Sequence, residues 1–253
     1  MIRQAVLLCA GLGTRLRPFT ENAPKAMVPI LGTPMIEWNI RRFVQFGVKE
    51  FFINLHHLPE QLPSYLGDGS KWGVRIQYRY ESDLLGTAGG VKNFESELDE
   101  EFFLIYGDIF SHLDYAAMET KWRSLPQAFG MQRVRRADGT LDADLAELDE
   151  CRRIIAVHPK PHSRVDSDSY PMSGIFILRR EVLSHVPAGS YSEIGKDLLP
   201  ALIARNAPFW GYICEDFTLG VDNLNKRQPV EAYLSGKGIK SPAGLAAPHG
   251  RPI

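Results

Sequence analysis

The sequence predicts an α/β fold with an open, mostly parallel mixed sheet flanked by helices. Short apolar runs typical of buried strands alternate with segments whose apolar residues recur at helical spacing, and this order favours parallel strands joined by helices. The 253 residues are 44% hydrophobic and 23% charged, which is ordinary for a globular domain with a sizeable core. We expect a single domain over residues 1–240 and a flexible Gly/Pro/Ala-rich tail over 241–253.

Composition narrows the class of protein. The formal net charge of −1 gives no general field that would attract nucleic acid. Three scattered cysteines lack metal-site spacing, and they suit a reducing compartment better than a disulfide framework. No signal-peptide pattern opens the chain, and no apolar run approaches the length of a membrane span. These features predict a cytoplasmic protein that binds neither membrane nor nucleic acid, and they carry no signal of oligomeric state.

The elements follow from apolar periodicity and from capping and turn residues. The expected strands are residues 5–10, 51–55, 74–80, 102–108, 129–135, 146–157, 170–178 and 209–213. The expected helices are residues 34–46, 59–66, 112–123 and 192–205.

The first strand ends in a loop suited to an anion. Gly11 and Gly13 permit positive φ and a close approach of the backbone to a ligand. Successive backbone N–H groups in such a turn form an anion-binding concavity, and Arg15, Arg17 and Lys25 add positive charge. The loop therefore predicts a polyphosphate site.

The strand expected over 102–108 ends in an acidic residue. Ligands of open α/β sheets bind beyond the carboxyl ends of strands, so Asp108 is well placed to hold a cation. Mg²⁺ suits this position because it is commonly held by one or two carboxylates together with substrate phosphates. A second reading, in which Asp108 caps a turn, is also open.

The run Gly11-Leu12-Gly13-Thr14-Arg15-Leu16 with Pro24-Lys25 resembles the signature of sugar-1-phosphate nucleotidyltransferases. The resemblance implies a Rossmann-like, GT-A-type fold with a nucleotide half over 1–110 and a sugar half over 111–240. It implies the coupling of a nucleoside triphosphate to a sugar 1-phosphate, with release of pyrophosphate. The branches most similar in appearance are mannose- and heptose-1-phosphate guanylyltransferases and N-acetylmuramate-1-phosphate uridylyltransferases.

The resemblance also assigns roles to residues. Arg15 and Lys25 are the expected catalytic cations, and Asp108 and Asp222 are the expected Mg²⁺ ligands. Asp222 could instead cap the helix that starts near Leu224. The expected nucleotide-binding residues are Leu8, Ala10, Gly11, Gly13, Thr14, Gly86, Thr87, Ala88 and Gly107. The small residues that follow Leu85 independently predict a helix start that presents free N–H groups.

The sequence motifs of the sugar half match the family less closely. Lys160 matches a lysine that contacts the sugar phosphate in related enzymes, Gly174 lies in a strand expected to line the sugar site, and Glu193 is a candidate acceptor for a sugar hydroxyl. Many relatives carry Glu-Lys-Pro where this chain has Pro159-Lys160-Pro161, so sugar identity is open. The acidic residues Asp142 and Asp144 are expected in a solvated loop.

Other functions fit the sequence less well. A nicotinamide-dependent dehydrogenase would carry a third glycine and an acidic residue about 20 positions on, where this chain has Leu16 and ends its second strand in Asn54-Leu55. No Gly-Lys-Ser/Thr triplet of a Walker-type NTPase follows the loop. The opening loop disfavours a glycosyltransferase of related fold. We expect GTP with mannose or heptose 1-phosphate, with a UTP- or CTP-dependent enzyme or a non-catalytic regulatory homologue as alternatives.

Overall fold

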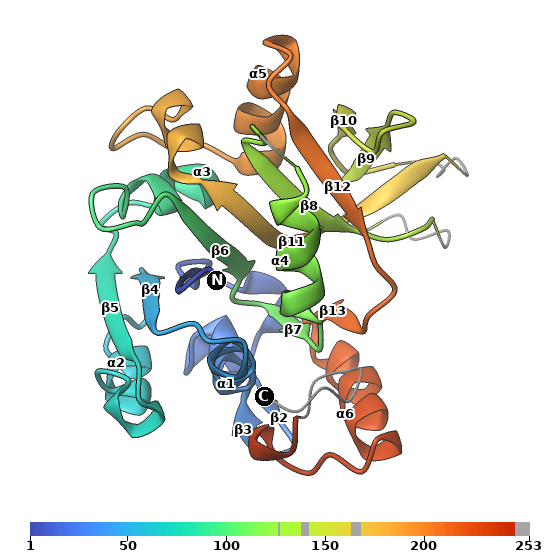
Figure 1. Cartoon of the computed structure of the whole chain (residues 1–253). Helices are drawn as coiled ribbons and strands as arrows, with labels where there is room; N and C mark the ends of the chain where they lie inside the picture. Colours follow the sequence, from blue (N-terminus) through green and yellow to red (C-terminus); the bar gives the residue numbers. More distant parts are fainter. Residues whose placement is uncertain (126, 138–141, 163–167, 246–253) are drawn as a thin grey trace. The chain divides into compact units, whose positions relative to one another are not determined.

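The computed structural model describes residues 1–125, 127–137, 142–162 and 168–245, and it divides the chain into two compact units. Unit 1 comprises Met1–Leu84, Ile105–Ala116 and Asp216–Ile253, and unit 2 comprises Leu85–Leu104 and Ala117–Glu215. Both units are assembled from separate stretches of sequence, whereas the sequence suggested two contiguous halves. Strands alternate with helices along the chain (Figure 1), and the expected Rossmann-like fold with a mixed sheet is confirmed.

Unit 1 contains a parallel sheet whose strands end at the candidate site. Strand β1 (Gln4–Leu8) pairs with β4 (Glu50–Leu55), and β4 pairs with β5 (Arg75–Tyr80). The apolar runs of β1 and β4 are almost completely buried, as expected for a sheet covered on both faces. The helices and short turns of this unit are α1 (Met35–Gln45), α2 (Gln61–Leu66), α6 (Arg227–Gly236), η1 (Thr14–Leu16), η2 (Phe19–Glu21), η3 (Lys25–Met27), η4 (Ser70–Trp72), η7 (Leu224–Lys226) and η8 (Pro242–Gly244).

Two short antiparallel pairs complete the strands of unit 1. Strand β2 (Pro29–Ile30) pairs with β3 (Thr33–Pro34), and β7 (Ile109–Ser111) pairs with β13 (Thr218–Gly220). The second pair joins segments that are far apart in the sequence. Its register sets Gly220 opposite Ile109, so the residues that follow β13 lie beside those that precede β7.

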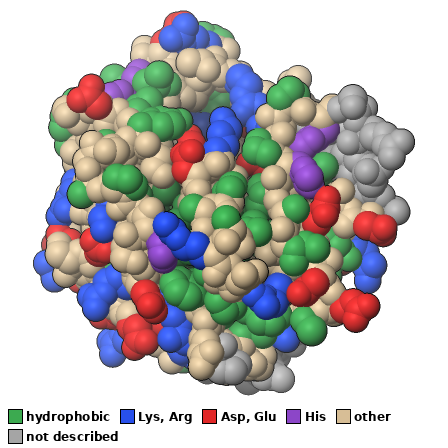
Figure 2. Space-filling model, turned by 90° about the horizontal axis from the view of Figure 1, so that it is seen from above, with side chains coloured by type: hydrophobic (Ala, Val, Ile, Leu, Met, Phe, Trp, Pro, Cys, Tyr) green, Lys and Arg blue, Asp and Glu red, His purple; other side chains and the backbone are tan. Residues whose placement is uncertain are grey.

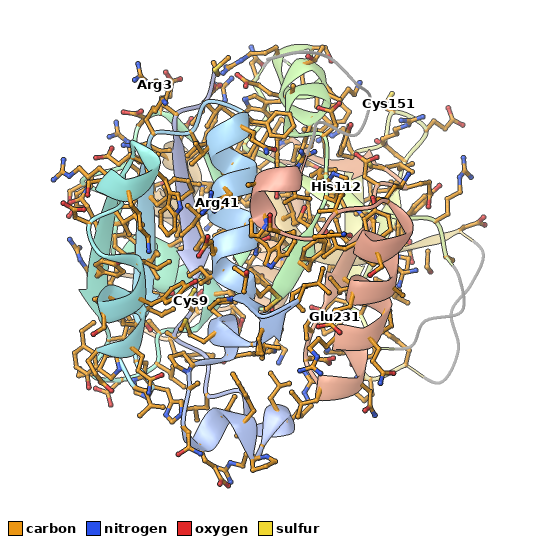
Figure 3. All side chains as sticks on the ribbon, turned by 90° about the horizontal axis from the view of Figure 1, so that it is seen from below. Arg3, Cys9, Arg41, His112, Cys151 and Glu231 are labelled. Carbon is orange, nitrogen blue, oxygen red and sulfur yellow. The ribbon has the colours of Figure 1, made fainter. Side chains whose placement is uncertain are left out.

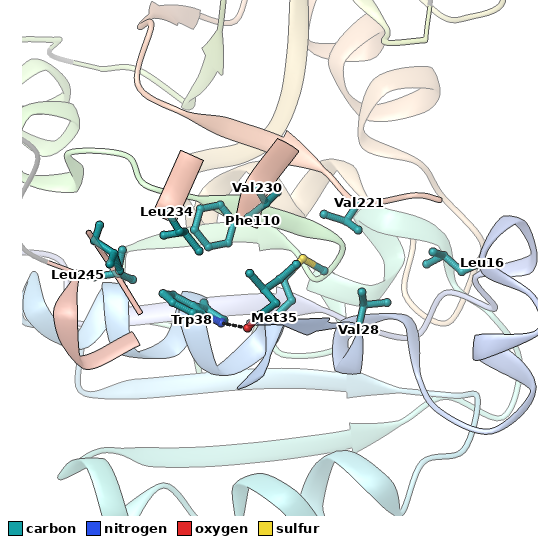
Figure 4. Packing of buried hydrophobic residues seen from close by; sticks show 11 residues of the cluster. Leu16, Val28, Met35, Trp38, Phe110, Val221, Val230, Leu234 and Leu245 are labelled. Carbon is teal, nitrogen blue, oxygen red and sulfur yellow. Dashed lines mark hydrogen bonds between the residues drawn. The ribbon is translucent and has the colours of Figure 1, made fainter. Parts of the chain in front are cut away.

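The C-terminal segment is part of the core of unit 1. Trp38 of α1, Phe110 of β7 and Val230 and Leu234 of α6 belong to one buried cluster, shown in Figure 4, in which Trp38 Nε1 donates to the backbone oxygen of Ile30 at 3.1 Å. Glu231 of α6, labelled in Figure 3, accepts a hydrogen bond from the backbone N–H of Leu31 at 3.1 Å. The segment 241–253 was expected to be a flexible tail. Leu245 is 1% exposed within the cluster, and residues 246–253 lie outside the described residues.

Unit 2 carries the antiparallel part of the fold. Strand β11 pairs antiparallel with β8 and with β9, β9 pairs antiparallel with β10, and β12 runs parallel to its partner β8. The division of the chain into units falls within β6 and within α4. The elements are α3 (Gly86–Lys92), β6 (Glu101–Tyr106), α4 (Tyr115–Arg123), β8 (Gly130–Val134), β9 (Leu145–Leu148), β10 (Ile154–His158), β11 (Ser169–Arg179), η5 (Arg180–His185), the π-turn η6 (Ile194–Leu198), α5 (Leu199–Ala204) and β12 (Phe209–Ile213).

Two predicted elements of unit 2 differ from the structure. The single strand expected over 146–157 is the hairpin β9–β10, because Asp149 closes a turn by accepting hydrogen bonds from the N–H groups of Arg152 and Arg153. The helix expected over 192–205 begins as the π-turn η6 and becomes α-helical only from Leu199. Among the described residues, no helix combines the length and apolarity that a membrane crossing requires.

The packing of α6 generates a prediction about stability. Leu234 is fully buried, so Leu234→Ala should lower the free energy of unfolding by about 2–5 kcal/mol, through lost burial and the cavity left behind. The neighbouring exposed Ser235 provides a control, because Ser235→Ala should change stability by less than about 0.5 kcal/mol. Urea denaturation measures both. A loss as small for Leu234→Ala as for Ser235→Ala would show that α6 is not part of this core.

Candidate active site

The loop after β1 is closed around Gly13. This residue has φ +60°, and a Cβ there would lie 2.8 Å from Thr20 Cγ2 and 3.2 Å from Lys25 Cβ, so only glycine fits without strain. The carbonyl of Gly13 accepts hydrogen bonds from the Leu16 N–H at 2.8 Å and from Thr20 Oγ1 at 2.9 Å. Gly11 differs, because a Cβ there would meet no atom within 4 Å. Packing therefore requires glycine at position 13 and not at position 11.

A buried polar chain anchors the start of this loop, and sequence reasoning missed it. The Cys9 N–H donates to Asn54 Oδ1 at 2.6 Å, and Asn54 Nδ2 donates to Glu81 Oε1 at 2.8 Å. Asn54 and Glu81 are 2% and 3% exposed. The signal in the sequence was a polar residue near the end of each of two strands, Asn54 in β4 and Glu81 directly after β5. Burial, with a contribution from Asp108, raises the pKa of the Cys9 thiol, which therefore stays protonated and is no nucleophile.

Asp108 lies where β6 gives way to β7. The Gly107 N–H donates to the Leu8 carbonyl at 2.8 Å, and a Cβ on Gly107 would lie 2.6 Å from Cys9 Sγ. Glycine at position 107 thus lets the segment approach the end of β1. The carboxylate of Asp108 accepts a hydrogen bond from Lys25 Nζ in an ion pair whose side chains are partly exposed, 16% for Lys25 and 28% for Asp108.

Asp222 forms ion pairs with two cationic side chains. Its Oδ2 accepts a hydrogen bond from Arg15 Nη1 at 2.6 Å, and its Oδ1 lies 2.7 Å from Lys226 Nζ. The Asp222 side chain is 9% exposed, against 58% for Arg15 and 33% for Lys226, so a buried carboxylate meets two cations that remain open to solvent. The backbone of the preceding residue, Val221, donates to the Asp108 carbonyl at 2.7 Å, which sets the two aspartates at neighbouring positions.

The turn after Asp222 explains how Lys226 reaches it. Asn223, and not Asp222, is the N-cap of η7, and its side-chain oxygen accepts a hydrogen bond from the Lys226 N–H at 3.2 Å. The cap fixes a short turn that brings residue 226 back over residue 222. Asp222 is thereby left to its ion pairs, and Lys226 is a site residue that sequence reasoning missed.

The cluster of Arg15, Lys25, Asp108, Asp222 and Lys226 sets three cations against two carboxylates. This local excess of positive charge suits a polyanion. Over the face of the molecule drawn in Figure 2, by contrast, acidic and basic side chains are interspersed. Within the described part of the chain, no group of three or more His, Cys, Asp or Glu side chains could hold a metal ion. The two aspartates alone suit a hard cation that shares its coordination with substrate oxygens.

The predicted base-binding segment of unit 2 is packed against the backbone of another loop. Gly86 has φ +73°, and a Cβ there would lie 2.5 Å from the Ser192 carbonyl. That carbonyl accepts hydrogen bonds from the N–H groups of Ala88 at 2.8 Å and Gly89 at 3.2 Å. The expectation of free N–H groups at this helix start is wrong for these two, because the distant Ser192 already binds them.

Glu193 lies in the same arrangement. Thr87 Oγ1 donates to Glu193 Oε2 at 2.7 Å, and the Tyr191 hydroxyl donates to Glu193 Oε1, which raises the pKa of Tyr191 to about 12. The Ile194 N–H in turn donates to Thr87 Oγ1 at 2.8 Å. Thr87 and Glu193, assigned separately to base and sugar from the sequence, therefore contact one another.

The other predicted sugar-site residues also lie in unit 2. Lys160 Nζ pairs with Asp142 Oδ1 at 3.1 Å, and the Lys160 N–H donates to Asp144 Oδ1 at 3.0 Å. Asp142 and Asp144 lie in a loop, as expected, with the Asp142 side chain 47% exposed, and both contact Lys160. Gly174 is buried in β11, at the irregularity of the β8–β11 register between Met172 and Phe176, and β-bulges of this kind are frequent next to active sites.

Comparisons with known proteins agree with this architecture. A family model described as nucleotidyl transferase matches residues 4–218. The chain is 30% identical to a UTP–glucose-1-phosphate uridylyltransferase of Synechocystis sp. over 82% of its length, and 30% identical to a mannose-1-phosphate guanylyltransferase of Mycobacterium tuberculosis over 83%. It spans only 57% and 58% of the lengths of these two relatives.

A solved structure shows the same fold. The inositol-1-phosphate CTP transferase from T. maritima superimposes with a TM-score of 0.77 at 19% identity, covering 94% of this chain and 98% of that one. The family model covers most of the chain, including the loop from Gly11 to Lys25 and Asp108. On these grounds the chain belongs to the nucleotidyl transferase family.

Proposed function

We propose that this protein couples a nucleoside triphosphate to a sugar 1-phosphate and releases pyrophosphate. A single observation carries the proposal: two aspartates lie beside the loop that Gly13 closes, and each forms an ion pair with a cation of that loop. Asp108 pairs with Lys25, and Asp222 pairs with Arg15. This arrangement supplies cations for phosphoryl oxygens and carboxylates for a metal ion in one place. The family to which the chain belongs supports the same reaction class.

The reaction needs positioning and charge neutralisation more than proton transfer. A phosphate oxygen of the sugar 1-phosphate is already an anion and can attack the α-phosphorus without a general base, while pyrophosphate leaves. In unit 1, backbone amides from Gly11 to Thr14, with Leu8, Ala10 and Gly107, line the nucleotide site. Arg15 neutralises the leaving phosphates, and Lys25 neutralises the α-phosphate or the attacking phosphate.

Asp108 and Asp222 would hold Mg²⁺. Two carboxylates at neighbouring positions provide the hard oxygen ligands that this ion prefers, and substrate oxygens would complete its coordination. When bound, the ion supplies Lewis-acid stabilisation of phosphoryl charge. The two carboxylates that would hold it are neutralised by ion pairs with Lys25, Arg15 and Lys226.

Unit 2 contributes the groups proposed for the base and the sugar. Gly86, Thr87 and Ala88 contact the nucleotide, Lys160 binds the sugar phosphate, Gly174 lines the sugar, and Glu193 accepts from a sugar hydroxyl. Glu193 already accepts from Thr87 and Tyr191, so a sugar hydroxyl would share or replace one of these bonds. Lys160 would exchange Asp142 for a phosphate.

We favour GTP with mannose or heptose 1-phosphate as substrates, with UTP or CTP as alternatives. Each of these three nucleotides has support from a similar protein, since the names of the relatives specify uridylyl, guanylyl and CTP transfer. A cytoplasmic location is part of the proposal, and it is supported by the three cysteines, all of which are free thiols.

A substrate panel tests the function. Purified protein is incubated with Mg²⁺, each of GTP, UTP, CTP and dTTP, and a series of sugar 1-phosphates that includes mannose, glucose, heptose and N-acetylmuramate. Pyrophosphate release should depend on both substrates and favour one pair. Release with no pair, under conditions where each triphosphate binds, would identify a non-catalytic homologue.

The ion pair of Lys25 and Asp108 yields a prediction about turnover. Lys25→Ala and Asp108→Asn should each lower kcat/KM by roughly 100- to 1,000-fold, because each removes charge stabilisation at the reacting phosphates. Each should change the free energy of unfolding by only about 1 kcal/mol, the order for one partly exposed ion pair. Pyrophosphate release and urea denaturation measure the two effects. Full activity of either variant in Mg²⁺ and triphosphate would refute the assigned roles.

The two loop glycines should respond differently to the same substitution. Gly11→Ala should keep wild-type stability, since its Cβ meets no protein atom, and should weaken triphosphate binding about tenfold by blocking close backbone approach. Gly13→Ala should lower both stability and binding, because of its positive φ and the contact with Thr20. Thermal denaturation and calorimetric titration with the preferred triphosphate separate the two cases. Unchanged binding by Gly11→Ala would mean that no ligand approaches this residue.

A further inference from the structure

Lys226 stands out because no assigned role accounts for its position. Its ammonium lies 2.7 Å from Asp222 Oδ1, and Arg15 occupies the other oxygen of the same carboxylate. The placement is built in, because the Asn223 cap closes the turn that returns residue 226 to residue 222. Lys226 remains partly exposed, with a third of its side-chain surface accessible.

The contact with Asp222 puts Lys226 in competition with a metal ion. A divalent cation that took Asp222 as a ligand would face an ammonium at hydrogen-bond distance from the same oxygen, and the like charges repel. The flexible four-carbon stem of lysine allows the ammonium to leave, and a polyphosphate offers it new charge-assisted hydrogen bonds. Arg15 can supply only one of the cations needed around a triphosphate.

We propose that Lys226 is a third phosphate-binding cation of this site, which occupies Asp222 while the site is empty and moves to the triphosphate when a metal ion takes that carboxylate. The inference rests on the proposed function and deepens it. It predicts opposite effects on two ligands when the ammonium is removed. The metal should bind more tightly without its competitor, and the triphosphate should bind more weakly without its partner.

The test uses Lys226→Met, with Lys226→Arg as the charge-conserving variant. Lys237→Met is the matched control, because Lys237 is an exposed lysine at the end of α6, outside the cluster. Mn²⁺ alone is titrated into substrate-free protein, and free Mn²⁺ is followed by its electron paramagnetic resonance signal. Separately, GTP and UTP are titrated calorimetrically in saturating Mn²⁺ without sugar phosphate. Neither measurement requires turnover.

For Lys226→Met we expect the Kd for Mn²⁺ in substrate-free protein to fall about two- to fivefold. We expect the Kd for the triphosphate in saturating Mn²⁺ to rise about tenfold. Lys226→Arg should keep triphosphate binding near that of the wild type, and Lys237→Met should leave both constants within about twofold. Tighter Mn²⁺ binding with unchanged triphosphate binding would show that Lys226 only neutralises Asp222, and would overturn the proposal. Weakening of both ligands would overturn it as well, since Lys226 would then merely hold Asp222 in place.

These outcomes are separable from failure of the proposed function. If wild-type protein releases no pyrophosphate with any pair in the panel, the catalytic proposal fails while the two binding constants still decide the role of Lys226. If the wild type turns over and Lys226→Met matches Lys237→Met in both titrations, only the role of Lys226 is lost.

Discussion

The antiparallel pairing of β7 with β13 is the constraint on which the site of unit 1 depends. It brings a segment from near the C-terminus against the segment that follows β6, and the bond from the Val221 N–H to the Asp108 carbonyl extends the pairing to the aspartates themselves. Two carboxylates at neighbouring positions repel one another unless each is compensated. Lys25 compensates Asp108, and Arg15 with Lys226 compensates Asp222, so the arrangement that suits a metal ion is also stable without one.

The same pairing makes the C-terminal segment indispensable to unit 1. Val221 lies in the buried cluster with Trp38 and Phe110, and α6 follows directly with Val230 and Leu234. The matched family model ends at residue 218, before Asp222, η7 and α6. The part of the chain least covered by the comparison therefore supplies the second aspartate, the lysine that pairs with it, and a side of the core that holds both.

Short local patterns were enough to propose most of the candidate residues of this site. The strand that ends at Gly11, the glycine at position 13, the Pro-Lys pair and the Gly-Asp at a strand end each carry a local physical reason. Side chains whose roles depend on distant partners were missed. Asn54 anchors the Cys9 amide through a bond across strands, and Lys226 depends on a capped turn after β13. The hairpin within 146–157 was missed because a single side chain, Asp149, decides the turn.

The amides of Ala88 and Gly89 show the same limit in unit 2, with a consequence for specificity. A helix start predicts unsatisfied N–H groups, yet the Ser192 carbonyl binds these two. Gly86 can approach that loop only because it lacks a Cβ, and the neighbouring Glu193 then receives the Thr87 hydroxyl. A residue assigned to the base and a residue assigned to the sugar are thus hydrogen-bonded to one another. Groups in one hydrogen-bond network do not contribute additively. In the proposed reaction, the preferences for base and for sugar would therefore be coupled through this contact, and neither stretch of sequence would encode its preference alone.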